Sequence, residues 1–553
     1  MDKTKPLFNL PDEAKKSKIV KDKDPEDQAG ELLRPRKTFR DAVHGDIMVT
    51  KLELAVMDTE EFQRLGKMKQ LGPSHLVYRC ATHTRFDHSL GTLHMAQRLI
   101  DFIQKNPFPD PKFSITNCHI LMTRMCALLH DLVNVPFGHT LEDEGNLFKS
   151  QWADKKRVEH FLGIKSTIGK NIIQICDENG LDGKRFLQEI RNILSADEEE
   201  DIEKLPYPFI SDIVHNTICA DLLDYVFRDV YFCGLKESYD ERFLSYFYIT
   251  TYDEKWRLVL RLIKPTTRRL RRDVLSETLH LLRLRYSLAE KVYYHHAKVK
   301  ASAMIISAVN SALRSGKIAE KDLYEKGDEE LLALVGNDIV GSYILNKLKR
   351  RELYRPVYRL SYLEQKLGSE VANRRKEIIE KFRNPLLRYE AERTLEDMNF
   401  LEKGQVIVYC PGSEMGHKAV KTLVEWENGK GPLNMIPDKR IADEIKTSIE
   451  DKHKELWNMF VFIDPIVSEK QRADIASDCV RSIVREMNEM EEYRDIREDY
   501  LERYKVCAEK ELETTASSHQ MAEIRNTAHR YVREKRFFGN IMTYSNFKEL
   551  LTQ

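Results

Sequence analysis

Several features are scarce in this chain of 553 residues. It has no apolar run of the roughly 18 residues that a membrane helix needs, and its first residues, MDKTKPLFNLPDEAKK, lack the apolar core of a signal peptide. Its nine cysteines are scattered from Cys80 to Cys507 without a C-x-x-C pair, which argues against a disulfide framework and a thiolate zinc site. We therefore expect a cytoplasmic protein without a membrane span.

An excess of charge of one sign is also lacking. Lys plus Arg and Asp plus Glu number 89 each, so the net charge is zero, which argues against a protein that holds nucleic acid by bulk positive charge. With 42% hydrophobic and 32% charged residues, the chain can bury cores and still expose a charged surface. At roughly 150 residues per domain, its length predicts more than one core.

The pattern along the chain favours a mostly α fold with a small α+β lobe. The segment ILMTRMCALLHDL at 120–132 is apolar nearly all round, as in a buried central helix. Strand signals are few and late: QVIVYC at 405–410 and MFVFIDP at 459–465. We predict a flexible charged tail at 1–36, a catalytic core at 37–330, an α+β regulatory or oligomerisation lobe at 331–465 and a helical region at 466–553.

Two charged segments can each be interpreted either as a solvated surface or as a functional site. The helix expected at 486–513 is a solvated surface helix or an assembly element. The basic string Arg268, Arg269, Arg271 and Arg272 is a solvated face or a site for an effector or nucleic acid. Charge alone favours the solvated face in both cases, so nucleic acid is not a required partner.

Histidine is concentrated in one part of the chain: nine of the 17 histidines fall between His44 and His160. In ALLHDLVNVPFGH, His130 and Asp131 stand side by side at the end of an apolar helix, where burying two polar groups is costly unless a partner satisfies them. A divalent metal would satisfy both, and this donor pair suits Mn, Fe, Zn or Mg. Because adjacent helical residues point about 100° apart, the pair can meet one ion at a helix end, which residues 133–136 supply.

Two more candidate metal ligands lie on other segments. His88 stands near the start of an amphipathic helix in HTRFDHSLGTLH, and Asp221 opens DLLDYVFRD. Along the second segment, Asp221, Asp224, Tyr225 and Arg228 share one face of an otherwise apolar helix. A structural salt bridge between Asp224 and Arg228 is the alternative interpretation for that pair.

Five ordered strings extend this pattern into a family resemblance. FRDAVHGDI, DTEEFQRLGKMKQLG, HTRFDHSLG, HDLVNVPFGH and DLLDYVFRD occur in the order found in HD-domain deoxynucleoside-triphosphate (dNTP) triphosphohydrolases. The chain resembles this family, which includes bacterial dGTPase-like enzymes and the SAM-and-HD-domain protein, over about 37–300 and on through KRRELYR near 350.

The resemblance implies a reaction and a metal site. It implies that His88, His130, Asp131 and Asp221 bind one divalent metal, with a further Mg ion accompanying the nucleotide. It also implies that water attacks the α-phosphorus of a dNTP and releases deoxynucleoside and triphosphate. A metal would polarise a phosphate oxygen and lower the pKa of water, while Arg85 would contact phosphate as a planar donor fork.

Three further residues match the family's acid–base groups. His139 matches the histidine that gives a proton to the departing 5′ oxygen, a task that suits its pKa class. His160 matches a further active-site histidine, and Glu142 stands where an acidic residue holds the imidazole in place.

The resemblance also implies substrate contacts. The substrate-binding residues implied are Gln70, Leu71, Asn134, Tyr225, Asp229, Arg285 and Tyr293. Gln70 and Leu71 match the contacts that leave no room for a 2′ hydroxyl. Ordinary aromatic core packing is the alternative for Tyr225 and Tyr293.

The sequence departs from the family pattern at three positions. Asn134 replaces a histidine and cannot carry a proton, Leu222 replaces a phosphate-contacting lysine of some relatives, and Gly66 replaces an effector-binding arginine. The remaining effector positions match, which implies a nucleotide-regulated homo-oligomer, a dimer or tetramer. Those positions are Lys37, Asp58, Gln63, Arg351 and Arg355.

Three functional hypotheses remain open. The first is a dNTP triphosphohydrolase that lowers the dNTP pool as regulation or antiviral defence. The second is an HD-type phosphodiesterase or phosphatase acting on nucleotides, a shift that Asn134 would mark. The third is a non-catalytic nucleotide sensor, against which the complete ligand set argues because a sensor has little need of it.

Overall fold

The structure is a computed structural model that describes residues 24–149, 151–196, 198–361, 377–412 and 421–483. It divides into two compact units. The first comprises the described residues of Met1–Ser302, Ser315–Asn337 and Gly412–Trp457, and the second those of Ala303–Arg314, Asp338–Pro411 and Asn458–Gln553. The units thus interleave along the chain, whereas the boundaries predicted from the sequence are sequential.

The first unit is mainly helical. Its helices are α1 (Pro25–Leu32), α2 (Lys51–Met57), α3 (Glu60–Gln63), α4 (Arg85–Gln104), α5 (Asn117–Leu129), α6 (Lys155–Leu162), α7 (Thr167–Glu178), α8 (Gly183–Leu194), α9 (Glu199–Glu203), α10 (Pro208–Val214), α11 (Ala220–Phe232), α12 (Arg272–Leu288), α14 (Asp328–Val335), α18 (Lys439–Ile445) and α19 (Asp451–Glu455). Helix α13 (His296–Arg314) begins in this unit and ends in the second.

The second unit is the small α+β lobe that the sequence predicted. Its elements are α15 (Ile339–Lys349), β5 (Arg355–Ser361), α17 (Pro385–Met398), β6 (Val406–Tyr409), β9 (Asn458–Ile463) and α20 (Glu469–Ile483). The strands form an antiparallel sheet in the order β5-β9-β6. Both late strand predictions are confirmed, because β6 and β9 coincide with the two apolar runs. The charged segment 486–513 lies outside the described residues.

Strands early in the chain were missed, so the expectation that strands are few and late is wrong. The hairpin β1 (Pro35–Asp41) and β2 (Gly45–Thr50) precedes the helices. A second sheet has the order β3-β4-β7-β8, with β3 (Phe247–Tyr252), β4 (Lys255–Arg261), β7 (Leu423–Trp426) and β8 (Gly429–Pro432). The sequence does not predict strand β1, because the strand is charged and almost entirely exposed and therefore lacks an alternation of apolar and polar residues.

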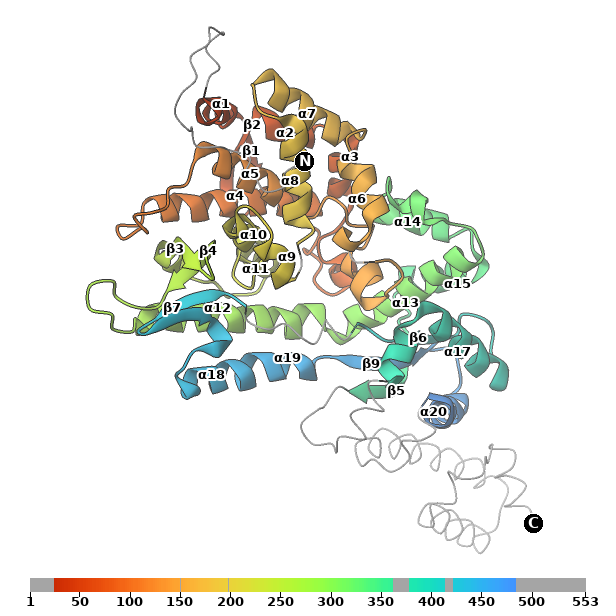
Figure 1. Ribbon diagram of the computed structural model, residues 1–553. Helices are drawn as coiled ribbons and strands as arrows, with labels where there is room; N and C mark the ends of the chain where they lie inside the picture. Colours follow the sequence, from red (N-terminus) through yellow and green to blue (C-terminus); the bar gives the residue numbers. More distant parts are fainter. Residues whose placement is uncertain (1–23, 150, 197, 362–376, 413–420, 484–553) are drawn as a thin grey trace, which may run out of the picture. The chain divides into compact units, whose positions relative to one another are not determined.

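Helices α4, α5 and α11 form the centre of the first unit, with α4 packed against both others (Figure 1). Helix α4 begins with a capping box, in which Thr84 and Asp87 bond each other's backbone N–H groups. Helix α5 is buried along its length, as predicted, and ends at Leu129. Its end leaves His130 and Asp131 in a turn rather than in the helix, which frees the pair to face one point.

The structure describes the predicted tail from residue 24 onward. Asp24 caps α1, whose Ala29 and Leu32 are buried in the core. The Glu26 side chain accepts the backbone N–H of Asn117 at 2.8 Å, which ties α1 to the start of α5. The expectation of a flexible tail is therefore wrong for Pro25–Leu32, because a few apolar residues and one capping contact suffice to dock a short helix.

None of the described helices is long and apolar enough to cross a membrane.

We predict that Gly91 sets the approach of α4 to α11. A Cβ atom at this position would overlap the Asp224 carboxylate and the Arg228 guanidinium. Gly91→Ala should therefore lower the free energy of unfolding by about 1–3 kcal/mol, the usual cost of overpacking. Chemical denaturation measures this change. Gly66→Ala is the matched control, since its Cβ would meet nothing closer than Phe86 at 4.0 Å. Equal stabilities of the two variants would contradict the prediction.

Candidate functional site

Four side chains from three segments converge at one point of the first unit. The Nε2 atoms of His88 and His130 lie 3.1 Å apart, and Asp221 Oδ1 lies 3.0 Å and 3.7 Å from them. Asp131 Oδ2 lies 3.9 Å and 3.8 Å from the same two nitrogens. Donor atoms of His88, His130 and Asp221 all lie within 4.8 Å of one another, a spacing that one metal ion can bridge. The structure thus brings together the four ligands inferred from the sequence.

The protonation pattern of the two imidazoles calls for a cation at this point. His88 Nδ1 lies 2.7 Å from Asp224 Oδ2, and His130 Nδ1 lies 2.8 Å from the backbone oxygen of Ala127. Both oxygens accept, so the hydrogen-bond network assigns a proton to each Nδ1, and each Nε2 can give its lone pair to a metal ion in place of a proton. Two lone pairs and two carboxylate oxygens then face one another, and a divalent ion fits this donor set.

The raised pKa of His88 also indicates that the surroundings of its imidazole favour a positive charge. Burial lowers the pKa of this imidazole, but hydrogen bonds to Asp221 and Asp224 outweigh burial and raise the pKa to about 10. A metal ion on Nε2 would take the place of that proton.

Asp224 holds His88 in place from behind. Its fully buried carboxylate also lies 2.7 Å from His44 Nε2 and 2.9 Å from two nitrogens of Arg228. Asp41 completes the network by accepting Arg228 Nη1 at 2.8 Å. Burial raises the pKa of Asp224, but Arg228 and the two histidines lower this pKa by a larger amount. The carboxylate therefore stays ionised. The salt bridge between Asp224 and Arg228 that the sequence suggested is therefore present. The Asp224 carboxylate also orients His88, a candidate metal ligand.

Two residues fix Asp131. Arg85 Nη1 lies 2.5 Å from its Oδ2, and Asn134 Nδ2 donates to its Oδ1 at 2.7 Å. Arg64, which the sequence did not single out, donates to the backbone oxygens of Asn134 and Leu132 at 2.9 and 2.7 Å. Asn134, at the position of the family histidine, is fully buried, and its Oδ1 has no hydrogen-bond partner among the described residues.

His139 is held by a different acid from the one expected. Its Nδ1 lies 2.5 Å from Asp143 Oδ2, one turn along the π-helix η3 (Thr140–Glu144). Glu142 instead pairs with Arg157 at 2.6 Å, so the role assigned to Glu142 is wrong: its side chain leaves the helix on another face. The Asp143 carboxylate raises the pKa of His139, whose side chain is 59% exposed.

His160 does not join this group in the described contacts. It lies on the exposed side of α6, with its ring 5.2 Å from that of Tyr324. The assignment of His160 to the active site is therefore corrected, because the face of α6 that packs inward carries Val158 and Phe161 instead.

A second cluster joins residues that the resemblance placed at the substrate. Asp229 accepts Tyr293 Oη at 2.6 Å and lies 2.8 Å from His83 Nε2. The His83 backbone oxygen accepts the N–H of Gln70, whose Oε1 is buried without a partner among the described residues. Leu71 follows and packs against the core. His83 was missed, although it begins the quoted string HTRFDHSLG.

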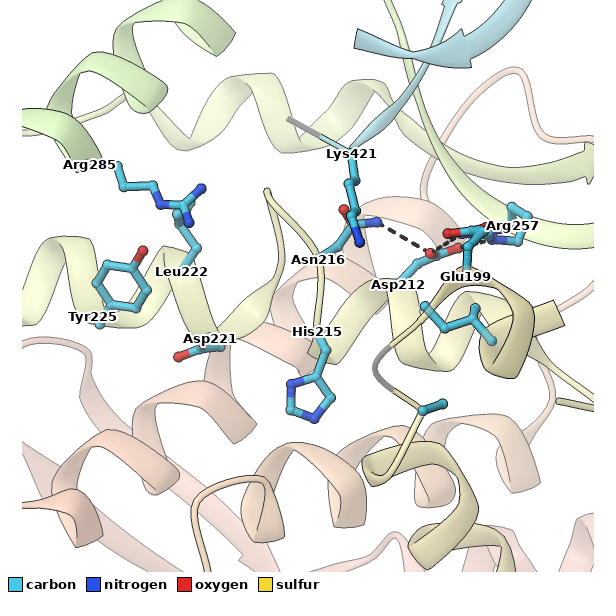
Figure 2. Close-up of a pocket in the computed structure, with 12 residues that line it drawn as sticks. Glu199, Asp212, His215, Asn216, Asp221, Leu222, Tyr225, Arg257, Arg285 and Lys421 are labelled. Atoms are coloured by element: carbon cyan, nitrogen blue, oxygen red, sulfur yellow. Dashed lines mark hydrogen bonds and ion pairs between the residues drawn. The ribbon is translucent and has the colours of Figure 1, made fainter. Parts of the chain in front are cut away.

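A cavity of about 280 Å³ borders the four-ligand cluster (Figure 2). Asp221, His215, Tyr225 and Arg285 line it, so two of the predicted substrate residues share a cavity with a metal-ligand candidate. Burial and the nearby His130 lower the pKa of His215 to about 4, so this imidazole is neutral near pH 7.

Asp328 at the start of α14 ties two loops of the site together. Its fully buried carboxylate accepts the backbone N–H of Lys69 at 2.8 Å and that of Phe137 at 2.7 Å. It therefore links the segment of Gln70 to the loop of His139. Burial raises the pKa of Asp328 to about 6, against the opposing effect of these two N–H groups. No motif in the sequence marks this residue.

The predicted effector residues are distributed over both units. Lys37 lies over the Phe39 ring at 5.0 Å, Asp58 ends α2, and the Gln63 side chain donates to the backbone oxygen of Met57. Arg351 and Arg355 lie in the second unit, so the effector set stays a prediction.

Most of the basic string lies before a helix rather than on one, since α12 begins at Arg272. Arg268 lies in a loop with φ of 57° and pairs with Glu425 at 2.7 Å, and Arg271 precedes α12 and pairs with Asp273. Both pairs lie at the surface, where the Arg268 side chain is 51% exposed and the Asp273 side chain 60% exposed, so the expectation of a solvated segment agrees with the structure at Arg268.

Two family models match the chain. One, described as the HD domain, matches residues 85–226, and the other, described as the HD associated region, matches residues 275–480. Residues 85–226 of the chain thus match an HD domain. All four converging ligands lie inside the matched HD domain, and the resemblance inferred from the five sequence strings is confirmed.

The match to each individual relative covers only part of that relative's length. An uncharacterized protein of Methanocaldococcus jannaschii is 29% identical over 328 residues, which are 59% of this chain and 61% of that protein. The deoxynucleoside triphosphate triphosphohydrolase SAMHD1 homolog of Dictyostelium discoideum is 31% identical over 288 residues, 52% of this chain and 51% of that protein. The chain thus spans about half to three fifths of these curated relatives.

A solved structure shows a similar fold. The crystal structure of a hypothetical protein from Aquifex aeolicus matches with a TM-score of 0.52 and 18% identity, over 79% of this chain and 99% of that one. At this identity the likeness concerns the fold alone.

We predict that Asp224 sets the metal affinity of the HD site through His88. Asp224→Asn removes the charge that raises the basicity of the imidazole, and loss of such a partner typically weakens metal binding by about 10- to 100-fold. Titration of the purified chain with Mn²⁺ measures the change. Asp46→Asn, which removes an exposed carboxylate paired with Arg40, serves as the control. Unchanged Mn²⁺ affinity in a folded Asp224→Asn variant would count against this role.

We predict that Asp328 protects the Lys69 and Phe137 amides from hydrogen exchange. Asparagine offers one accepting oxygen instead of two, so Asp328→Asn should lower protection of one amide by roughly 10- to 100-fold. In the native chain, the same loss should appear as the pH falls below about 6 and the carboxyl takes up a proton.

Hydrogen exchange read out by mass spectrometry or NMR, corrected for the intrinsic pH dependence, tests this role of Asp328. Glu329→Gln, at an exposed neighbour, should leave both amides protected. Equal protection in the Asp328→Asn chain would rule the link out.

Proposed function

We propose that this HD-domain protein is a metal-dependent hydrolase that converts a dNTP to deoxynucleoside and triphosphate. The observation that carries the proposal is the convergence of His88, His130, Asp131 and Asp221 beside a cavity that Arg285 and Tyr225 line. The similarity to the triphosphohydrolase of Dictyostelium discoideum over half of each chain supports the substrate class.

The donor atoms and the cavity fit the chemistry of phosphate-ester hydrolysis. When bound, a divalent metal polarises a phosphate oxygen and lowers the pKa of water. The guanidinium of Arg85 lies against Asp131, at the same edge of the cluster, and can donate to an α-phosphate oxygen. Arg285 has no ion-pair partner among the described residues and is available to the outer phosphates.

His139 is the proposed proton donor. In the reaction, the attacking water would lose a proton to solvent as its oxygen bonds to the α-phosphorus, the bond from phosphorus to the 5′ oxygen would break, and the 5′ oxygen would take a proton from His139. The Asp143 carboxylate favours the protonated form of His139, which suits a general acid. Asn134 cannot carry a proton, so the usual second histidine of this segment contributes none here.

The sugar end of the substrate is assigned to the second cluster. We propose that Gln70, Leu71 and Tyr225 contact the deoxyribose, and that Asp229 and Tyr293 contact its 3′ hydroxyl. The buried and unpartnered Gln70 Oε1 supports this assignment, since a ligand hydroxyl would satisfy it.

Regulation and assembly are part of the proposal. The matching positions Lys37, Asp58, Gln63, Arg351 and Arg355 support a nucleotide effector held in a homo-oligomer. Control of the dNTP pool, including antiviral defence, would follow from such an activity.

A second candidate rests on Asn134. Because a proton-carrying histidine is absent where Asn134 bonds Asp131, the site also suits an HD phosphodiesterase or phosphatase, which splits a different bond of a nucleotide.

Product analysis tests the proposal. Purified chain with Mn²⁺ and each dNTP, alone and in mixtures, should yield deoxynucleoside and triphosphate, resolved by chromatography. His130→Ala and Asp131→Ala should lower the rate by at least about 100-fold, since both ligands are lost from the metal. Orthophosphate or pyrophosphate as the inorganic product would replace the proposed reaction with the second candidate. Binding without turnover would favour a sensor.

A further inference from the structure

The cavity beside the HD site carries two cations that are not neutralised. Arg285 enters from α12 and Lys421 from the segment before β7, and Figure 2 shows both directed into the cavity from the side opposite Asp221 and His215. Neither has an ion-pair partner among the described residues of the cavity wall. Arg257, the third cation of the wall, is neutralised by Asp212 at 2.8 Å and by Glu199.

The charge of the cavity is positive once the metal site is considered. Its wall holds three cations, Arg257, Arg285 and Lys421, and three carboxylates, Glu199, Asp212 and Asp221. Asp221 lies 3.0 Å from His88 Nε2 and belongs to the metal-ligand set. A bound divalent ion would be offset by Asp221 and Asp131, so the rest of the wall would hold three cations against two carboxylates, an excess of one positive charge. Such a cavity attracts a polyanion.

Lys421 is positioned by the backbone that carries Asp221. The Lys421 N–H donates to Thr217 Oγ1 at 2.8 Å, and Thr422 Oγ1 accepts the N–H of Ile218 at 3.0 Å. Residues 217 and 218 lead directly into α11, where Asp221 stands in the first turn. Two reciprocal contacts therefore fix the start of β7, and with it Lys421, relative to the metal-ligand set. Lys421 lies outside the matched HD domain.

We propose that Lys421, together with Arg285, binds the terminal phosphates of the substrate. This inference rests on the proposed function for the identity of the substrate, but the polyanion site itself does not require turnover. The arrangement of the cavity supports it: Asp221 of the metal-ligand set lines one side, where the α-phosphate would bind, and Arg285 and Lys421 lie on the other side, where the rest of the triphosphate would reach (Figure 2). A lysine ammonium offers three donors to such oxygens.

Binding of inorganic tripolyphosphate to the full chain tests the proposal without catalysis. At constant free Mg²⁺, Lys421→Ala should weaken tripolyphosphate binding by roughly 10- to 100-fold, the value of a hydrogen bond to a charged group. Lys421→Arg should retain most of the affinity. Because the Lys421 side chain is exposed, its removal is not expected to unfold the chain.

Two controls make the experiment specific. Lys170→Ala removes an exposed lysine of α7 outside the cavity and should leave tripolyphosphate binding unchanged. Binding of a deoxynucleoside, which lacks phosphate, should be unaffected by Lys421→Ala.

The outcomes separate this inference from the proposed function. Weaker tripolyphosphate binding in Lys421→Ala supports the site even if no dNTP is hydrolysed, in which case only the proposed reaction fails. Equal tripolyphosphate affinities of Lys421→Ala and the native chain overturn the inference even if hydrolysis is found. Absence of tripolyphosphate binding by the native chain overturns it as well.

Discussion

The geometry of the HD site depends on one buried carboxylate, that of Asp224. It bonds Arg228 of its own helix, His88 of α4 and His44 before β2, so a single charge joins three segments of the chain. The interior tolerates this charge because it is fully paired, and an unpaired one would cost several kcal/mol. The same contact requires a glycine at position 91, where any side chain would displace the carboxylate. The packing of α4 against α11 and the geometry of the site therefore depend on the same contacts. These contacts place His88 next to Asp221.

Other buried polar groups hold the irregular segments that follow the helices. Arg64 binds the backbone oxygens of the turn after α5, and Asp328 binds the N–H groups of two loops. These segments carry Asp131, Asn134, Gln70 and His139, none of which lies within a regular α-helix. Hydrogen bonds from buried charged groups have directions that apolar packing lacks, and functional side chains need such fixed positions. The site is therefore built at the ends of elements, with its supports drawn from distant parts of the sequence.

Sequence reasoning succeeded where a local pattern carries the information. The apolar length of α5 and the late strands β6 and β9 are local signals, and the structure also brings together the four candidate metal ligands that the family resemblance implies. It failed where a contact between distant parts of the chain determines the position of a side chain. The acid beside His139 is Asp143 because a π-helical turn changes which residue faces the ring, and His160 lies on the outer face of α6. Asp328 and Lys421 reach the site only through folding, and no spacing along the chain marks either of them.

Arg85 would link the candidate metal ligands to the proposed phosphate site. Its Nη1 lies 2.5 Å from Asp131 Oδ2, the same oxygen that faces the Nε2 atoms of His88 and His130. A cation held by the two histidines must therefore share that oxygen with the guanidinium, while Asn134 retains the other. Gly138 leaves room for this arrangement, since a Cβ there would overlap the Arg85 guanidinium. Because Arg85 has other N–H groups to offer, a phosphate oxygen can compete for them without releasing Asp131. Metal and phosphate would thus bind next to each other through one shared arginine, which favours an anionic substrate that spans both.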